Sequence, residues 1–160
     1  MAMTSHLPVE TAPERDAHAA FPALAVGSAF GAALAFAGVG AVTWNLGGNG
    51  IGMVAGAIIS LLAGLLALPP ATRSGALLLV WNALGIGCAL FVIGIFSVGA
   101  LVAFPLVLLA IALSSWPRRD GESIANVPAI AVQIAGFLLV PALYGLYDGL
   151  VADVRRLIGL

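Results

Sequence analysis

Long uncharged stretches separated by short polar segments dominate the chain. Asp, Glu, Lys and Arg are absent from residues 17–72, 74–117 and 123–147. A helix needs about 20 apolar residues to cross the roughly 30 Å of hydrocarbon in a bilayer, so these stretches can hold two, two and one crossings. Helices are expected because a backbone in lipid must satisfy its own hydrogen bonds. The pattern predicts an all-α, polytopic integral membrane helical bundle with about five transmembrane helices.

Glycine and proline residues set the expected ends of these helices. Residues 45–50 are typical of a turn, Pro69 and Pro70 stop a helix, and residues 97–99 offer a break within the second stretch. Asn126 is a candidate N-cap for the last helix. The predicted spans are residues 21–43, 51–68, 76–95, 100–115 and 127–147. Pro105 and Pro141 lie inside two of these spans and should kink them.

One alternative organisation stays open in the second uncharged stretch. Trp81 and Asn82 are residue types that favour the membrane interface, although the predicted third span buries them more than one turn deep. Four spans plus a re-entrant segment would place them at the headgroups.

The two ends of the chain are expected to lie outside the transmembrane domain of residues 21–147. Residues 1–20 are polar and predict a flexible tail. Residues 148–160 are too few to cross again, and they place apolar and charged side chains on opposite helical faces. This second segment predicts a short amphipathic helix lying in the membrane interface.

The composition strengthens the assignment to a membrane. The chain has 160 residues, of which 62% are hydrophobic and 8% charged, whereas soluble domains have about 45–50% apolar and about 25% charged residues. A soluble domain could not cover this much apolar surface, and a nucleic-acid binder would need a basic face. Disorder would require low hydrophobicity and high net charge. The expected partners are the lipid bilayer and either a second copy of the chain or another membrane protein.

The arginines indicate an orientation. With five spans, Arg15, Arg73, Arg118 and Arg119 lie on one side, and Arg155 and Arg156 on the other. The positive-inside rule then favours a cytoplasmic N-terminus. Arg118, Arg119, Arg155 and Arg156 are the candidate membrane-surface residues. Abundant Ala and Gly, with Arg and no Lys, are typical of a GC-rich genome and favour a bacterial plasma membrane.

Small residues at regular spacing are the candidate helix-packing positions. Gly48, Gly52, Gly56, Ser60 and Gly64 recur every four residues, and Gly27 and Gly31 repeat this spacing in the first span. Helices in lipid associate through close contact at such residues. We expect the first span to pack on the second. The ridge could alternatively form an oligomer contact or line a pore.

Two amides, Asn82 and Gln133, are the candidate buried polar residues. An amide in lipid must find a hydrogen-bond partner, typically for about 0.6–2 kcal/mol. Interhelical bonding is the favoured role, and the alternative is a polar lining for a neutral solute.

The predicted spans contain no Asp, Glu, Lys, Arg or His, and this limits the chemistry available in the membrane. A proton-coupled transporter, an aspartyl protease or a voltage sensor would need such groups. The order of residues 50–55 matches a dinucleotide fingerprint, but no strand is expected before it and no acidic residue follows at the required distance. We expect no catalytic, cofactor-binding or metal site. The predicted function is that of a non-catalytic subunit, scaffold or regulator of a membrane assembly, with a channel or facilitator for a small neutral solute as the alternative.

Overall fold

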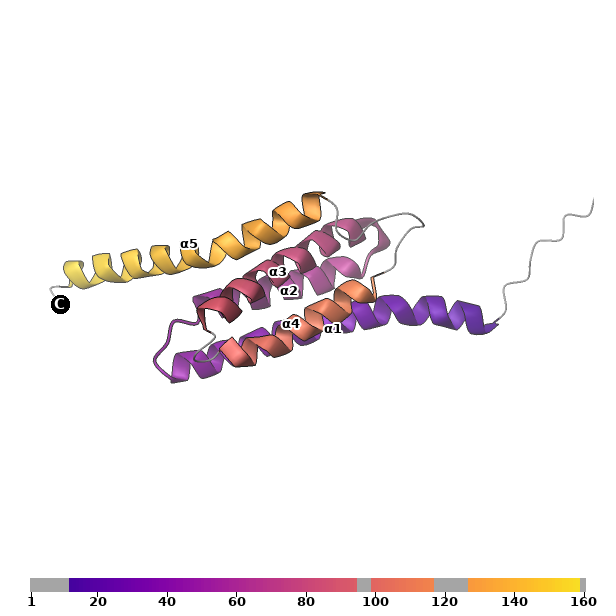
Figure 1. Ribbon diagram of the computed structural model, residues 1–160, viewed down its shortest axis with the longest axis horizontal. Coiled ribbons are helices and arrows are strands. Elements are labelled where there is room, and N and C mark those ends of the chain that lie inside the picture. The colour runs from indigo at the N-terminus through magenta and orange to yellow at the C-terminus, as the bar shows by residue number, and fades with distance from the viewer. Residues whose placement is uncertain (1–11, 95–98, 117–126, 159–160) are drawn as a thin grey trace, which may run out of the picture.

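The computed structural model describes residues 12–94, 99–116 and 127–158, and every regular element in these ranges is a helix. The prediction of an all-α fold is therefore confirmed. The elements are α1 (Ala12–Asn45), α2 (Ile51–Ala67), the short 3-10 helix η1 (Pro70–Thr72), α3 (Arg73–Ile93), α4 (Gly99–Ser114) and α5 (Val127–Leu157) (Figure 1). Three of them, α1 from Ala23 onward, α3 and α5, are long and apolar enough to cross a membrane, and α2 and α4 are shorter apolar helices.

The first four long helices form a closed ring. α1 packs on α2 and α4, and α3 packs on the same two helices. α5 lies outside the ring, mainly against α3 and to a smaller extent against α2. Both α1 and α5 extend beyond the other helices, at opposite ends of the molecule (Figure 1). The ring is therefore the packed unit, and α5 is attached to one side of it.

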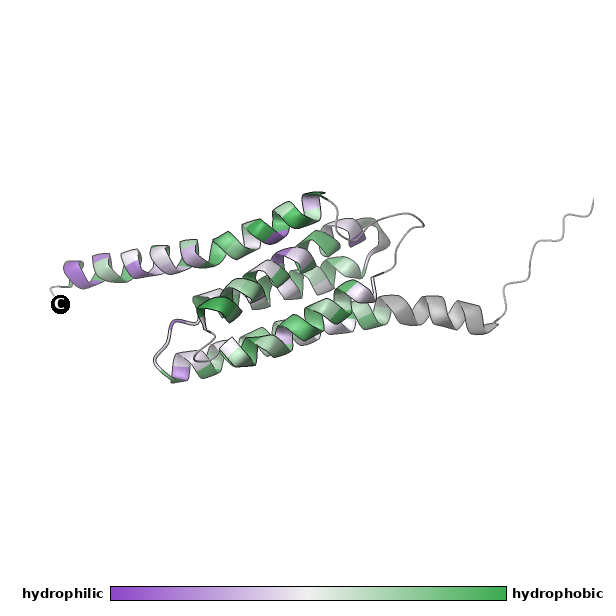
Figure 2. Ribbon diagram, in the orientation of Figure 1, coloured by the Kyte–Doolittle hydropathy of each residue, from purple (hydrophilic) through white to green (hydrophobic). Residues whose placement is uncertain are grey.

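The distribution of side-chain size explains the packing. Alanines supply much of the buried core and allow helices to approach closely, as is common between helices in lipid; they include Ala25, Ala29, Ala32, Ala63, Ala76, Ala83, Ala89 and Ala112. Large aliphatic side chains such as Leu34, Ile58 and Leu138 are exposed on the outer surface instead. Hydrophobic residues predominate over the ring, and hydrophilic ones gather toward the end of α5 (Figure 2). This inside-out distribution suits a lipid surrounding.

Local backbone chemistry makes the turn between α1 and α2. Gly47 has a φ of 77°, a conformation that glycine adopts without steric cost. The Gly48 N–H donates to Thr43 O at 2.9 Å, and the Ile51 N–H donates to Asn49 Oδ1 at 3.0 Å. These bonds satisfy backbone groups that the two helix ends leave free. The predicted turn is present, although α1 continues through Asn45.

The first helix is longer than predicted. α1 begins at Ala12, so residues 12–20 are helical instead of belonging to a flexible tail. The sequence gives the reason: Pro13 stands in the first turn, where its missing N–H costs no hydrogen bond, and the following residues are rich in helix-favouring alanine. The polar side chains of this segment do not interrupt the backbone hydrogen bonds of the helix.

The C-terminal segment is helical, but it continues the last predicted span instead of forming a helix of its own. α5 runs without a break from Val127 to Leu157, through the expected boundary at Tyr147. Gly145 and Gly149 weaken a helix without ending it, and Pro141 removes a single backbone donor. The other boundaries lie within three residues of those predicted, and α3 is continuous across Trp81 and Asn82, without a re-entrant break. Ser97, Val98 and Asn126 lie outside the described residues.

Candidate functional site

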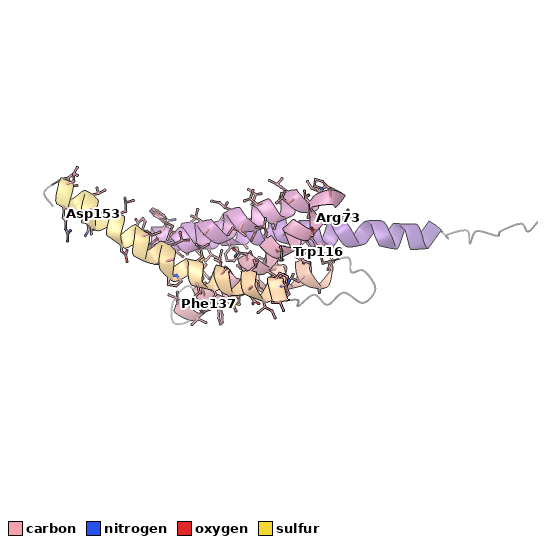
Figure 3. The ribbon with its side chains drawn as sticks, turned by 90° about the horizontal axis from the view of Figure 1, so that it is seen from above. Arg73, Trp116, Phe137 and Asp153 are labelled. Atoms are coloured by element: carbon pink, nitrogen blue, oxygen red, sulfur yellow. The ribbon has the colours of Figure 1, made fainter. Side chains whose placement is uncertain are left out.

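The charged side chains that the structure places lie at the end of the ring or beyond it. Arg73 opens α3 at the end of the ring where Trp116 also lies, and Asp153 lies near the outer end of α5 (Figure 3). Asp153 and Arg156 approach within 3.9 Å, but both are so exposed that this pair adds little stability. The described residues contain no group of three potential metal ligands. The candidate sites are therefore neutral contacts between helices.

α3 and α5 approach each other closely at two glycines, Gly85 and Gly136. Asn82 Nδ2 donates a hydrogen bond to Val132 O at 3.0 Å. One turn further along, a Cβ on Gly85 would overlap the Gln133 carbonyl oxygen and lie 3.0 Å from Phe137 N. A Cβ on Gly136 would overlap the Asn82 carbonyl oxygen in the same way. The two backbones touch, and each glycine makes room for a carbonyl of the other helix.

The two predicted amides differ in their contacts. Asn82 is half-buried and joins α3 to α5. Gln133 is also half-buried, but within the described residues its side chain makes no hydrogen bond, and its backbone is what contacts Gly85. Both amides lie at the contact between α3 and α5, and only Asn82 bonds across it with its side chain within the described residues.

We expect Asn82→Leu to lower the free energy of unfolding by about 1 kcal/mol, because it removes an interhelical hydrogen bond. Gln133→Leu should change it by less than about 0.5 kcal/mol, since no bond is lost. Denaturant titration of each variant in mixed micelles gives the comparison. Equal losses in the two variants would contradict the assignment of the polar contact to Asn82.

The small-residue positions of α2 are occupied from within the chain. A Cβ on Gly56 would lie 3.1 Å from Phe36 Cδ1, and one on Gly64 would lie 3.1 Å from Phe30 Cε1, both rings coming from α1. Gly52 faces Leu90 of α3 and Tyr144 of α5. Ser60 is fully buried. Aromatic rings of α1 thus occupy the space beside Gly56 and Gly64 of α2.

Three predicted packing glycines have other surroundings. Gly48 lies exposed in the turn before α2, because that helix begins only at Ile51. A Cβ on Gly27 would meet nothing within 4 Å, and one on Gly31 would meet Leu108 of α4 instead of α2. On the α1 side, the interface with α2 is formed by Phe30, Phe36 and Gly40 instead. The side chains on each face of α1 therefore determine which helix packs against that face.

Phe36 is a central residue that the sequence pattern did not single out. Its ring is fully buried and lies against Gly56 of α2. A Cβ on Gly87 of α3 would lie 3.2 Å from Phe36 Cζ and 2.6 Å from Leu106 Cδ2 of α4. All four ring helices therefore meet here. A large aromatic residue within a run of alanines and glycines was the available signal.

A second overlooked contact fixes the position of α5 along its axis. Tyr144 Oη donates a hydrogen bond to Asn49 O, in the turn before α2, at 2.8 Å. Because Asn49 lies in the turn between α1 and α2, this bond places Tyr144 level with the end of the ring. Residues 145–157 of α5 therefore extend past the ring (Figure 1).

Three buried polar atoms have no hydrogen-bond partner within the described residues: Asn49 Nδ2, Ser60 Oγ and Trp81 Nε1. They belong to separate elements, the first turn, α2 and α3. An apolar groove of about 330 Å³ lies between α1 and α2, and it is lined by Ala37, Gly40, Ala41, Trp44, Val54, Ala57 and Ile58. This groove contains no titratable group.

The predicted membrane-surface residues are only partly described. Arg155 and Arg156 are exposed at the end of α5, whereas Arg118 and Arg119 lie outside the described residues. Trp44 is 58% exposed near the end of α1, but Trp116 is only 8% exposed. Trp116 is therefore packed within the bundle.

These contacts bind helices to one another and include no recognisable catalytic constellation within the described residues. Packing of this kind is compatible with many activities, since fold alone does not assign function. Comparison of the chain with models of protein families, with curated proteins and with solved structures found no match.

Proposed function

We propose that the chain crosses the bacterial plasma membrane five times, with its N-terminus in the cytoplasm, and acts as a non-catalytic subunit, scaffold or regulator of a membrane assembly. In this arrangement α1 to α5 are the five spans. Consecutive helices reverse direction, so Arg73 lies on the cytoplasmic side and the end of α5 on the outer side. The positive-inside rule supports this orientation.

The observation that carries the proposal is how the interior of the ring is filled. The Phe36 ring lies at the contact of all four ring helices, against Gly56 and Gly87. Asn82, the amide that bonds across helices, is engaged with a backbone carbonyl. With reactive groups missing from the described spans, the outer surface is what the molecule offers to partners. That surface is broad and apolar, and α5 contributes most of its length to it.

A channel for a small neutral solute is the second candidate, favoured by Ser60 Oγ and Trp81 Nε1. Both atoms are buried and unpaired within the described residues, and water in a solute path could satisfy them. Asn82 and the α2 glycines, however, lie at different interfaces. A path lined by both would have to cross the packed ring, so we place the channel second.

The proposal predicts a stable membrane complex. Chain extracted in a lipid-preserving polymer from its own membrane should carry a protein partner, or a second copy of itself, in fixed stoichiometry by native mass spectrometry. A chain ending after Tyr147 keeps Tyr144 and the ring contacts, and it tests whether the exposed end of α5 contributes to binding. An unaccompanied monomer that speeds solute entry into vesicles would contradict the proposal and favour the channel.

A further inference from the structure

We draw no further inference here: the strongest candidate, the outer face of α5 around Gly145 and Gly149, where a Cβ would meet nothing within 4 Å, is an exposed stretch of small and apolar residues, and nothing in the part of the chain that the structure describes shows what covers it.

Discussion

Replacing Gly136 with leucine is expected to separate α5 from α3 and to lower the free energy of unfolding by about 3 kcal/mol, the upper range for overpacking. The obstacle is backbone: the new Cβ would overlap the Asn82 carbonyl oxygen and lie 3.1 Å from Asn82 Nδ2. A flexible side chain could rotate away from the new Cβ, but a carbonyl oxygen within a helix can move only together with the rest of that helix. The movement would also break the bond from Asn82 to Val132. Denaturant titration in mixed micelles measures the loss.

Gly145→Leu is the matched control for this prediction. It lies on the same helix, and a Cβ there would meet nothing within 4 Å. Because glycine is a poor helix former, this change should leave stability unaltered or raise it by up to about 1 kcal/mol. Gly85→Leu should behave like Gly136→Leu, since its Cβ would overlap the Gln133 carbonyl oxygen. If Gly136→Leu and Gly145→Leu had similar stability, the close contact of α3 and α5 would be refuted.

The second large effect is expected at Gly56. Gly56→Leu places a branched side chain where three atoms of the Phe36 ring already lie 3.1–3.2 Å from the position of a Cβ. The ring is fully buried and also lies close to Gly87 of α3, so it has little room to move. We expect a loss of about 2–3 kcal/mol in the free energy of unfolding. The same micelle titration applies, with Gly38→Leu, whose Cβ would meet nothing within 4 Å, as control.

A compensating variant makes this prediction specific. Phe36→Ala alone should cost about 3–5 kcal/mol, since it empties a fully buried site. Combined with Gly56→Leu, the leucine should occupy part of that space. The double variant should then be more stable than the sum of the single effects requires, by about 1–2 kcal/mol. Strict additivity would show that the two residues do not share this site.

The long uncharged stretches determined the helices and most of their ends. A backbone in lipid has few alternatives to a helix, so the fold class follows from composition and from the spacing of the charges. The turn at Gly47 and the stop at Pro69 are local properties and were predicted from residue type. Local signals were misleading where a polar residue was taken for the end of a helix, as before Phe21 and after Tyr147. A polar side chain does not break the backbone hydrogen bonds of a helix, so the helix can continue through it.

The pairing of helices could not be derived in this way. Repeats of small residues show that a helix can be approached closely, but they do not say by which neighbour. Gly31 meets α4, and Gly136, an isolated glycine within an apolar helix, lies where the backbone of α5 meets that of α3. The isolated glycine was itself a signal, because it costs a helix about 1 kcal/mol and needs a reason. The residue that it contacts, however, is Asn82, which lies 54 positions earlier in the chain.

The sequence by itself determined that this chain is a set of apolar helices with its charges at their ends, because the cost of burying a charge in lipid acts on each residue separately. Tertiary structure decided that Phe36 joins the four ring helices, that Asn82 and not Gln133 bonds across helices among the described residues, and that Tyr144 fixes the position of α5. Such contacts depend on rotation and axial displacement between helices. The rotation and displacement depend on how all the helix surfaces fit together, so they cannot be derived from the sequence of any one helix.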